Sequence, residues 1–391
     1  MQMISRITVV FVLCAALLFP IVSKTQDSSH MRVSLLTCTP GDELYSTFGH
    51  TAIRIVDTSS QLDLVFNYGT FDFDDPGFYS KFVRGSLFYF LSVENFEDFK
   101  NAYFYTNRGI TEQVLNFSAE EKIKIHDYLY ENSKDENKYY QYDFLFDNCT
   151  SRVRDLIFTI KKNKTPLKPV TPSGYTFRNG IHEYLDKNEK EWSKLGIDIL
   201  LGSPTDKIAT TNETLFLPDN LMKEMNVLDS TDNSISSTSN LYDLPAVEKK
   251  KTGVTPTQLF SFLLILAFGL SFNKHQKITT FVSGLDGLLF FTTGLIGCVL
   301  IFMWTSTEHE MCKNNYNLLW ALPTNLILSF IRNKKNKFVQ YCFGGTAIIL
   351  LITVLNWKFW PQEMNSALIP IIIWLIWRSI FIFIKLKNES N

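Results

Sequence analysis

Two side chains stand out as a pair that could do thiol chemistry. Cys149 follows an aromatic segment, 139–148, and precedes a segment with helical character, 150–160. A helix N-terminus carries about half a positive charge and presents free backbone N–H groups, so a cysteine there is readily ionised to the thiolate. The same N–H groups can stabilise an oxyanion. The sequence therefore predicts Cys149 as a nucleophile.

A thiolate needs a base, and His50 is the candidate because it begins a segment, 50–56, that alternates like a β-strand. The segment 62–68 completes a hairpin with it and carries Asn67. A polar residue on the paired strand can orient the imidazole, as the third member of a catalytic triad does. We therefore expect His50 to act as general base and acid, and Asn67 to orient it.

A disulfide is the alternative role for Cys149. The chain has six cysteines among 391 residues, which is too few for a disulfide framework. Only Cys38 and Cys149 lie in the soluble part of the chain, so a single bridge between them is possible in an oxidising compartment. The sequence leaves the nucleophile and the bridge both open.

The segments around this pair predict an α+β domain over 31–227 with a small antiparallel sheet. A hairpin is followed by a helix, further strands and then the cysteine at a helix start. Ser118 and Glu121 form the pattern of a capping box, which predicts the start of one helix. The expected strands are 31–36, 50–56, 62–68, 86–92, 109–116 and 139–146, and the expected helices are 94–105, 118–132, 150–160 and 179–192.

The chain before and after this domain has a different character. A basic residue followed by a short apolar run predicts a signal peptide over 1–23, or an uncleaved anchor, and an exported domain after it. The segment 228–254 is rich in Ser, Thr, Asp and Asn at its start and predicts a flexible linker. The net charge is −1, so no global field favours a nucleic acid partner, and no cofactor or metal is expected.

The last part, 255–387, is too apolar for a soluble domain and predicts an all-α membrane domain. Basic residues in 274–277, 332–337 and 385–387 would face the cytoplasm by the positive-inside rule, which leaves the exported domain outside. Asp286 lies within a span and is either a functional group or a structural partner of Asn317, Thr324 or Asn325. The five expected spans are 255–273, 278–304, 316–331, 338–357 and 365–384.

A histidine that opens a strand, a polar residue on the next strand and a later Asn-Cys at a helix start resemble the permuted papain-like group, which includes NlpC-like hydrolases and lecithin:retinol acyltransferase. The chain more closely resembles the Lnb family of lipoprotein N-acyltransferases. The segments that carry this resemblance are 40–54, 67–73, 142–155, 196–202, 286–287, 294–297, 308–309 and 317–323.

The resemblance implies a multi-pass protein of the bacterial inner membrane with its catalytic domain in the periplasm. Cys149 would take an acyl chain from a phospholipid as a thioester, and the α-amine of a diacylglyceryl-cysteine lipoprotein would then attack it. Further residues are candidates for substrate binding, or for salt bridges or loops that only support the fold. They are Glu43, Arg54, Tyr68, Arg152, Asp155, Asp286 and His309.

Two other functions compete with this interpretation. A membrane-tethered thiol peptidase or amidase would use the same pair of Cys149 and His50, although a soluble substrate does not require five spans. A non-catalytic periplasmic chaperone or scaffold would use Cys149 only in a bridge to Cys38. Thiol labelling without reductant separates the bridge from the free nucleophile.

Overall fold

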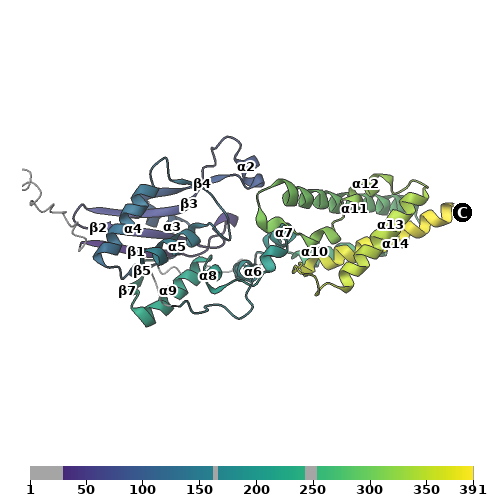
Figure 1. Ribbon diagram of the computed structural model, residues 1–391. Helices are drawn as coiled ribbons and strands as arrows, with labels where there is room; N and C mark the ends of the chain where they lie inside the picture. Colours follow the sequence, from purple (N-terminus) through teal and green to yellow (C-terminus); the bar gives the residue numbers. More distant parts are fainter. Residues whose placement is uncertain (1–29, 162–165, 243–252, 391) are drawn as a thin grey trace, which may run out of the picture.

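The computed structural model describes residues 30–161, 166–242 and 253–390. Its N-terminal part is a sheet covered by helices, and its C-terminal part is an elongated bundle of helices (Figure 1). The predicted signal peptide, 1–23, lies outside the described residues. The structure therefore has the predicted order of an α+β domain followed by a helical domain.

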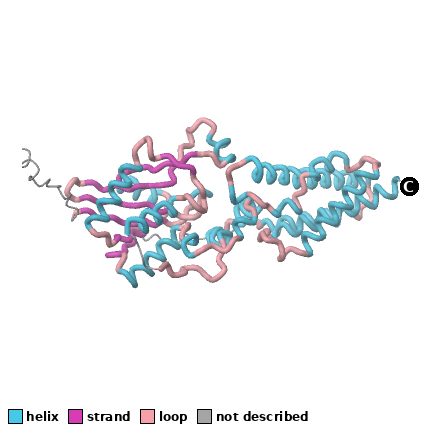
Figure 2. The backbone as a smooth tube through the Cα atoms, viewed as in Figure 1, coloured by secondary structure: helices cyan, strands magenta, loops and turns pink. Residues whose placement is uncertain are grey.

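In the described part of the chain the sheet has seven strands in the order β6-β4-β3-β2-β1-β5-β7, and every pair of neighbours is antiparallel. Figure 2 shows these strands side by side in the N-terminal domain. The hairpin expected around His50 is confirmed as β2 and β3. The strands are β1 Met31–Cys38, β2 His50–Asp57, β3 Leu62–Thr70, β4 Phe88–Asn95, β5 Ile110–Leu115, β6 Tyr139–Gln141 and β7 Ile235–Asn240.

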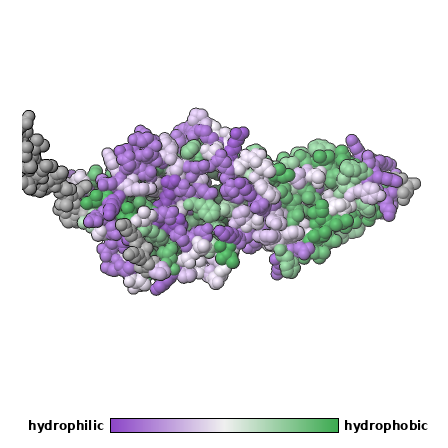
Figure 3. Space-filling model, in the orientation of Figure 1, coloured by the Kyte–Doolittle hydropathy of each residue, from purple (hydrophilic) through white to green (hydrophobic). Residues whose placement is uncertain are grey.

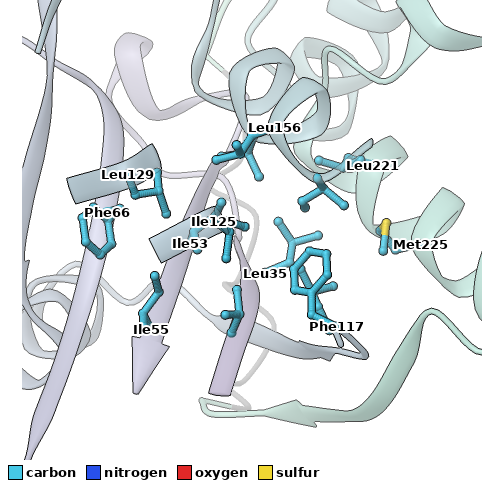
Figure 4. Packing of buried hydrophobic residues seen from close by; sticks show 14 of the residues in the cluster. Leu35, Ile53, Ile55, Phe66, Phe117, Ile125, Leu129, Leu156, Leu221 and Met225 are labelled. Carbon is cyan, nitrogen blue, oxygen red and sulfur yellow. The ribbon is translucent and has the colours of Figure 1, made fainter. Parts of the chain in front are cut away.

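Alternation along β2 divides its side chains between two cores. Ile53 and Ile55 pack with apolar residues of α4 (Ala119–Asn132), α5 (Cys149–Lys161) and α9 (Pro218–Asp232) (Figure 4). Ala52 faces the other side, where α3 (Phe96–Tyr105) covers the sheet. Each fully buried Ile or Leu stabilises the fold by about 1.5–3 kcal/mol. The two faces together fix β2 and hence the position of His50 at its first residue.

Some expectations about this domain are wrong at their boundaries. The single helix expected over 179–192 is two helices, α6 Phe177–Lys187 and α7 Glu191–Leu200. The strand expected over 139–146 ends at Gln141, because Asp143 and Asp147 pair across a tight turn, and the Asp143 carboxylate accepts the N–H groups of Leu145 and Phe146. The linker expected from 228 begins later, because α9 continues to Asp232 and β7 pairs with β5. The rest of that linker, 243–252, lies outside the described residues.

Shorter helices fill the space between the sheet and the membrane domain, and α6 and α7 lie where the two domains meet (Figure 1). The capping box predicted at Ser118 is confirmed at the start of α4. These shorter elements are η1 Leu44–Ser46, α2 Phe78–Arg84, α6 Phe177–Lys187, α7 Glu191–Leu200, η2 Ser203–Asp206 and α8 Thr211–Thr214.

Within the described residues 253–390, the membrane domain contains three helical stretches long and apolar enough to cross a bilayer: 276–306, 337–355 and 366–389. They correspond to the second, fourth and fifth predicted spans. The first predicted span is a 16-residue helix, and the third is a 3₁₀ turn followed by an eight-residue helix. The helical elements are α10 Pro256–Ser271, α11 Gln276–Ser306, η3 Glu310–Cys312, η4 Tyr316–Leu319, α12 Thr324–Ile331, α13 Lys337–Leu355, η5 Ser366–Leu368 and α14 Ile369–Ser390.

The broken third segment lies directly against α11. A Cβ added at Gly294 or Gly297 would collide with the backbone of Leu326 or Ala321, so only glycine permits this approach. Non-helical backbone at membrane depth is tolerated where protein buries it, and the tight contact with α11 provides that burial. The segment thus follows α11 for part of its length without forming one long helix.

The two ends of the membrane domain differ in polarity. Figure 3 shows a hydrophobic band over this domain and hydrophilic residues at the end that carries the C-terminus. Lys335 pairs with Glu389 at 3.6 Å, which places the basic loop 332–337 at that same end. The sheet domain lies at the opposite end (Figure 1), in agreement with the predicted orientation.

A polar network joins the two domains at α7. The Asn317 amide donates to the carbonyl oxygens of Asp198 and Ile199, at 2.9 and 3.2 Å. The Asn365 amide donates to the Asp198 carboxylate at 2.9 Å, and the Gly202 N–H donates to the Met311 carbonyl at 2.7 Å. Hydrogen bonds to both backbone and carboxylate therefore hold the sheet domain in one orientation on the membrane domain.

Candidate active site

Cys149 is the first residue of α5, as the sequence predicts. Asn148 precedes it, and its side-chain oxygen accepts the Ser151 N–H at 2.8 Å, which caps the helix. The Asn148 amide in turn donates to the carbonyls of Phe144 and Phe216. Asn148 therefore fixes the start of α5 and places the Cys149 thiol at the positive end of the helix.

His50 opens β2 and lies beside this thiol. Its Nε2 lies 2.5 Å from the Asn67 Oδ1 on β3, which leaves the other ring nitrogen for the thiol. The Asn67 Nδ2 donates to the Glu94 Oε1 on β4 at 3.2 Å. A chain of hydrogen bonds across three adjacent strands thus orients the imidazole. Gly69 has φ +91°, a conformation that favours glycine, and a Cβ added there would lie 3.5 Å from the Cys149 Cβ, so β3 passes beside the thiol.

The surroundings of Cys149 favour its thiolate. Burial opposes ionisation, but the charge and hydrogen bond of His50, the Thr51 N–H and the Thr150 hydroxyl together lower the pKa of Cys149 to about 7. Burial likewise lowers the pKa of His50, yet the facing thiolate and the hydrogen bond to Asn67 raise it overall. The two shifts agree with a thiolate–imidazolium pair.

The other cysteine of the sheet domain has the opposite character. Cys38 lies across from His50 in the register of β1 and β2, and burial raises the pKa of its thiol to about 12. Both Cys38 and Cys149 are free thiols, so the structure does not contain the alternative bridge. Of the two thiols, Cys149 is therefore the one whose surroundings favour the thiolate.

Alkylation kinetics provide a direct measurement of this difference. The rate of Cys149 alkylation by iodoacetamide is expected to rise with pH and to reach half of its maximum near pH 7, since the reactive form is the thiolate. In a His50→Ala variant the midpoint should move up toward the pKa of an ordinary thiol, and the rate near neutrality should fall about tenfold or more. Peptide mapping would follow Cys149 and, as an internal control, Cys38. An unchanged midpoint in the variant would contradict the pairing of Cys149 with His50.

Cys149 and His50 open into a cavity of about 960 Å³ that both domains enclose. The sheet domain contributes mainly aromatic rings, and the membrane domain contributes the segment from Glu308 to Cys312. The described part of the lining contains four carboxylates and no lysine or arginine. Its apolar members are Leu44, Tyr45, Phe48, Phe71, Phe73, Phe78, Tyr79, Phe82, Leu87, Tyr89, Tyr142, Phe144, Leu145, Ile181, Leu201, Phe216, Leu217, Pro218 and Met311.

Two family models match this chain, one in each domain. Residues 19–176 match the Lnb N-terminal periplasmic domain, and residues 248–390 match the Lnb transmembrane domain. The chain belongs to the Lnb family. No curated protein and no solved structure matches it.

Membership in the Lnb family confirms the resemblance that the sequence motifs indicate. The Lnb domains assign the sheet domain to the periplasm and the helical domain to the membrane. Cys149, His50 and Asn67 all lie within the matched periplasmic domain, and Glu308 and His309 lie within the matched transmembrane domain. The cavity is thus built from both Lnb domains.

Of the residues predicted to bind substrate, only His309 lines the cavity. Its ring lies against Gly85, and its Nε2 is 3.0 Å from the Phe82 carbonyl of α2. Glu308 precedes it, lines the cavity as well, and accepts a hydrogen bond from the Gln141 amide. The outer loop of the membrane domain therefore approaches the cavity, which was one of the two interpretations of His309.

The other candidates in the sheet domain serve the fold and lie outside the cavity lining. Arg54 is buried, pairs with Asp63 and Glu112, and lies over the Phe96 ring. The Arg152 guanidinium pairs with Asp147, a cavity residue, and lies over the Tyr140 ring. Their role is to hold strands and the 143–147 turn in place.

Tyr68, Asp155 and Glu43 are also outside the cavity lining. Tyr68 is buried, and its hydroxyl donates to the Asn132 side chain at 2.5 Å. Asp155 pairs with the neighbouring Arg154. Glu43 is exposed, and its carbonyl accepts hydrogen bonds from the hydroxyl groups of Ser46 and Thr47.

Asp286 pairs with Arg378 of α14 at 2.6 Å, deep in the membrane domain. The structural interpretation of Asp286 therefore holds, but its predicted partners were wrong. Asn317 bonds to α7, Asn325 bonds to Thr293, and Arg378 points into the bundle instead of toward the bilayer surface. A buried carboxylate in lipid needs a full charge partner, which an amide does not supply.

Three contributors to the site carried no signal in the sequence. Glu94 supports Asn67 only because β4 lies beside β3, and a bulge between Asn67 and Thr70 shifts their register. The Thr51 N–H reaches the Cys149 sulfur only because β2 begins against α5. Gln141 holds the Glu308 carboxylate across the domain boundary. Each contact depends on long-range packing, which local patterns do not specify.

Proposed function

We propose that the protein is a lipoprotein N-acyltransferase that moves an acyl chain from a membrane phospholipid to the α-amine of a diacylglyceryl-cysteine lipoprotein. The observation that carries this proposal is the position of the pair of Cys149 and His50 in an apolar cavity that the membrane domain helps to enclose. We further propose that the sheet domain is permuted papain-like, and that all five apolar segments of the membrane domain lie in the bilayer.

In the first step the Cys149 thiolate attacks the carbonyl carbon of a phospholipid ester. The N–H groups at the start of α5 stabilise the oxyanion of the tetrahedral intermediate. When the intermediate collapses, the C–O bond breaks, the lysophospholipid oxygen leaves, and the His50 imidazolium supplies its proton. The acyl chain then remains on Cys149 as a thioester.

In the second step the lipoprotein α-amine attacks the thioester. Neutral His50 takes a proton from the amine, the C–S bond breaks, and the thiolate leaves to reform the pair with the imidazolium. A thioester is more reactive toward an amine than the original oxygen ester, so the covalent intermediate divides one difficult step into two easier ones.

The charge of the cavity suits an amine acceptor. Its described lining contains Asp143, Asp147, Glu308 and Glu310 but no lysine or arginine, so it favours a cationic or neutral group over an anionic one. Its aromatic walls suit acyl chains. A thiol peptidase would use the same pair of residues, but a cell-wall peptide needs no apolar cavity bounded by a membrane domain.

The test is to trap the acyl-enzyme. The purified full-length protein, held in phospholipid vesicles without an acceptor, is expected to gain the mass of one acyl chain on Cys149. Neutral hydroxylamine should remove this adduct, because it cleaves thioesters. A Cys149→Ser variant is the control, since an oxygen ester on serine would resist the same treatment. If no acyl mass forms on Cys149, or if hydroxylamine does not remove it, the proposed mechanism is wrong.

A further inference from the structure

The short helix α2 has an unusual environment for part of a soluble domain. Two glycines in left-handed conformations bracket it, Gly77 with φ +84° and Gly85 with φ +73°. Tyr79 is 79% exposed and Phe82 is 51% exposed, although both line the cavity. Rings on a helix that turns sharply at both ends are therefore presented outward at the rim of the site.

Hydrogen bonds tie α2 to the outer end of the membrane domain. The Glu308 N–H donates to the Arg84 carbonyl at 2.9 Å, and the His309 Nε2 lies 3.0 Å from the Phe82 carbonyl. The Gln141 amide donates to the Gly85 carbonyl at 3.0 Å. Figure 1 shows α2 beside the end of α11 that meets the sheet domain. Because α11 is long and apolar enough to span a bilayer, α2 would lie level with the outer surface of a bilayer that α11 crosses.

Other exposed rings of the cavity rim extend the same surface. Tyr45 and Phe73 are 69% and 61% exposed and line the cavity, and the Phe73 and Phe78 rings pack with centroids 5.0 Å apart. We call Tyr45, Phe73, Tyr79 and Phe82 the aromatic lip. Grouped exposed aromatic rings mark interaction sites, and aromatic side chains are enriched where protein meets the membrane interface.

The charges of α2 fit a membrane surface as well. Its basic residues are Lys81, which pairs with Asp75 at 2.6 Å, and Arg84, which is exposed. A helix with basic residues beside aromatic rings is the pattern of segments that lie in the headgroup region. The aromatic lip thus adjoins the outer end of the membrane domain. Its residue composition is that of a segment at the membrane interface.

We propose that the aromatic lip inserts into the outer-leaflet interface and forms the entrance for lipid. An acyl chain passes from the bilayer between the lip and the segment from Glu308 to Cys312, and reaches Cys149 through the apolar cavity. The identity of the lipid as an acyl donor rests on the proposed function. The insertion of the lip into the bilayer does not.

Insertion is tested with a spin label at Tyr79→Cys, introduced into the full-length Cys149→Ser protein in phospholipid vesicles. The matched control is Tyr105→Cys at the end of α3, where the tyrosine is 82% exposed and lies outside the cavity lining. Unsubstituted Cys149→Ser protein gives the background labelling. The label at position 79 is expected to collide more often with oxygen, which concentrates in the bilayer, than with a water-soluble nickel chelate. The label at position 105 is expected to show the reverse, with more collisions with the nickel chelate than with oxygen. Equal nickel accessibility at the two positions would overturn the proposal.

Lipid entry is tested separately through acylation of Cys149. In a Tyr79→Ser/Phe82→Ser variant, acylation by vesicle phospholipid is expected to fall about tenfold or more, because two rings lose their apolar contact with lipid. Acylation by a short-chain, water-soluble nitrophenyl ester should fall by a much smaller factor, since this donor needs no bilayer entrance. A parallel loss with both donors would overturn the entrance role. If the parent protein itself takes no acyl chain from any phospholipid, the proposed function fails while the insertion result stands.

Discussion

Replacing Cys149 with alanine is expected to abolish N-acylation of lipoproteins in a strain that relies on this protein. Without the thiol no thioester can form, and removal of a covalent nucleophile from a catalytic group that acts as a unit costs about 10⁴–10⁶-fold in rate. Mass spectrometry of the N-terminal lipopeptides would show the diacylglyceryl form with a free α-amine. Lipoproteins that remain fully N-acylated would rule out the proposed transfer.

The matched control is Cys38→Ala. Cys38 is buried opposite His50, and burial raises the pKa of its thiol, so it takes no part in the proposed steps. N-acylation in this variant should remain within a few-fold of the parent, with a small cost from lost packing. An equal loss in both variants would instead favour a structural bridge between Cys38 and Cys149. The pair of variants therefore separates the nucleophile from the disulfide.

The parts of the site that the sequence predicted are those that local patterns determine. Alternation over 50–56 identified a strand that begins at His50, and the following turn identified its hairpin partner with Asn67. The change from an aromatic segment to helical spacing identified the helix that Cys149 opens. Each of these signals comes from apolar residues that recur along a short segment, every second residue in a strand and about every 3.6 residues in a helix.

The parts that the sequence did not predict depend on which elements meet. Glu94 is 27 residues from Asn67, and Gln141 is 167 residues from Glu308. The partner of Asp286 is 92 residues away, on the last helix. The periodic pattern of apolar residues cannot predict such contacts, because they depend on how distant elements pack together. The position of α2 at the cavity rim depends on such distant contacts as well.

The junction between the domains shows the same dependence on distant contacts. Arg178 of α6 is fully buried and pairs with Asp198 and Asp206, each at 2.8 Å. Burial alone would raise the pKa of Asp198, but the hydrogen bond from His182 and the charge of Arg178 lower it, so the carboxylate stays ionised. Asn365 of the membrane domain binds this same carboxylate. Arg178 thus neutralises the Asp198 carboxylate, which both domains contact. Residue 178 lies outside the segments that the two family models match.

Replacing Arg178 with alanine is therefore expected to destabilise the protein by about 3–5 kcal/mol, because it leaves two carboxylates without their buried charge partner. For a folded unit of this size the apparent Tm should fall by about 6–20 °C, measured by thermal unfolding of the full-length protein in detergent. Lys194→Ala is the control, since Lys194 pairs with the half-exposed Asp186 and such pairs contribute less than about 1 kcal/mol. If the apparent Tm falls equally little in both variants, the orientation of the catalytic domain does not depend on the Arg178 network.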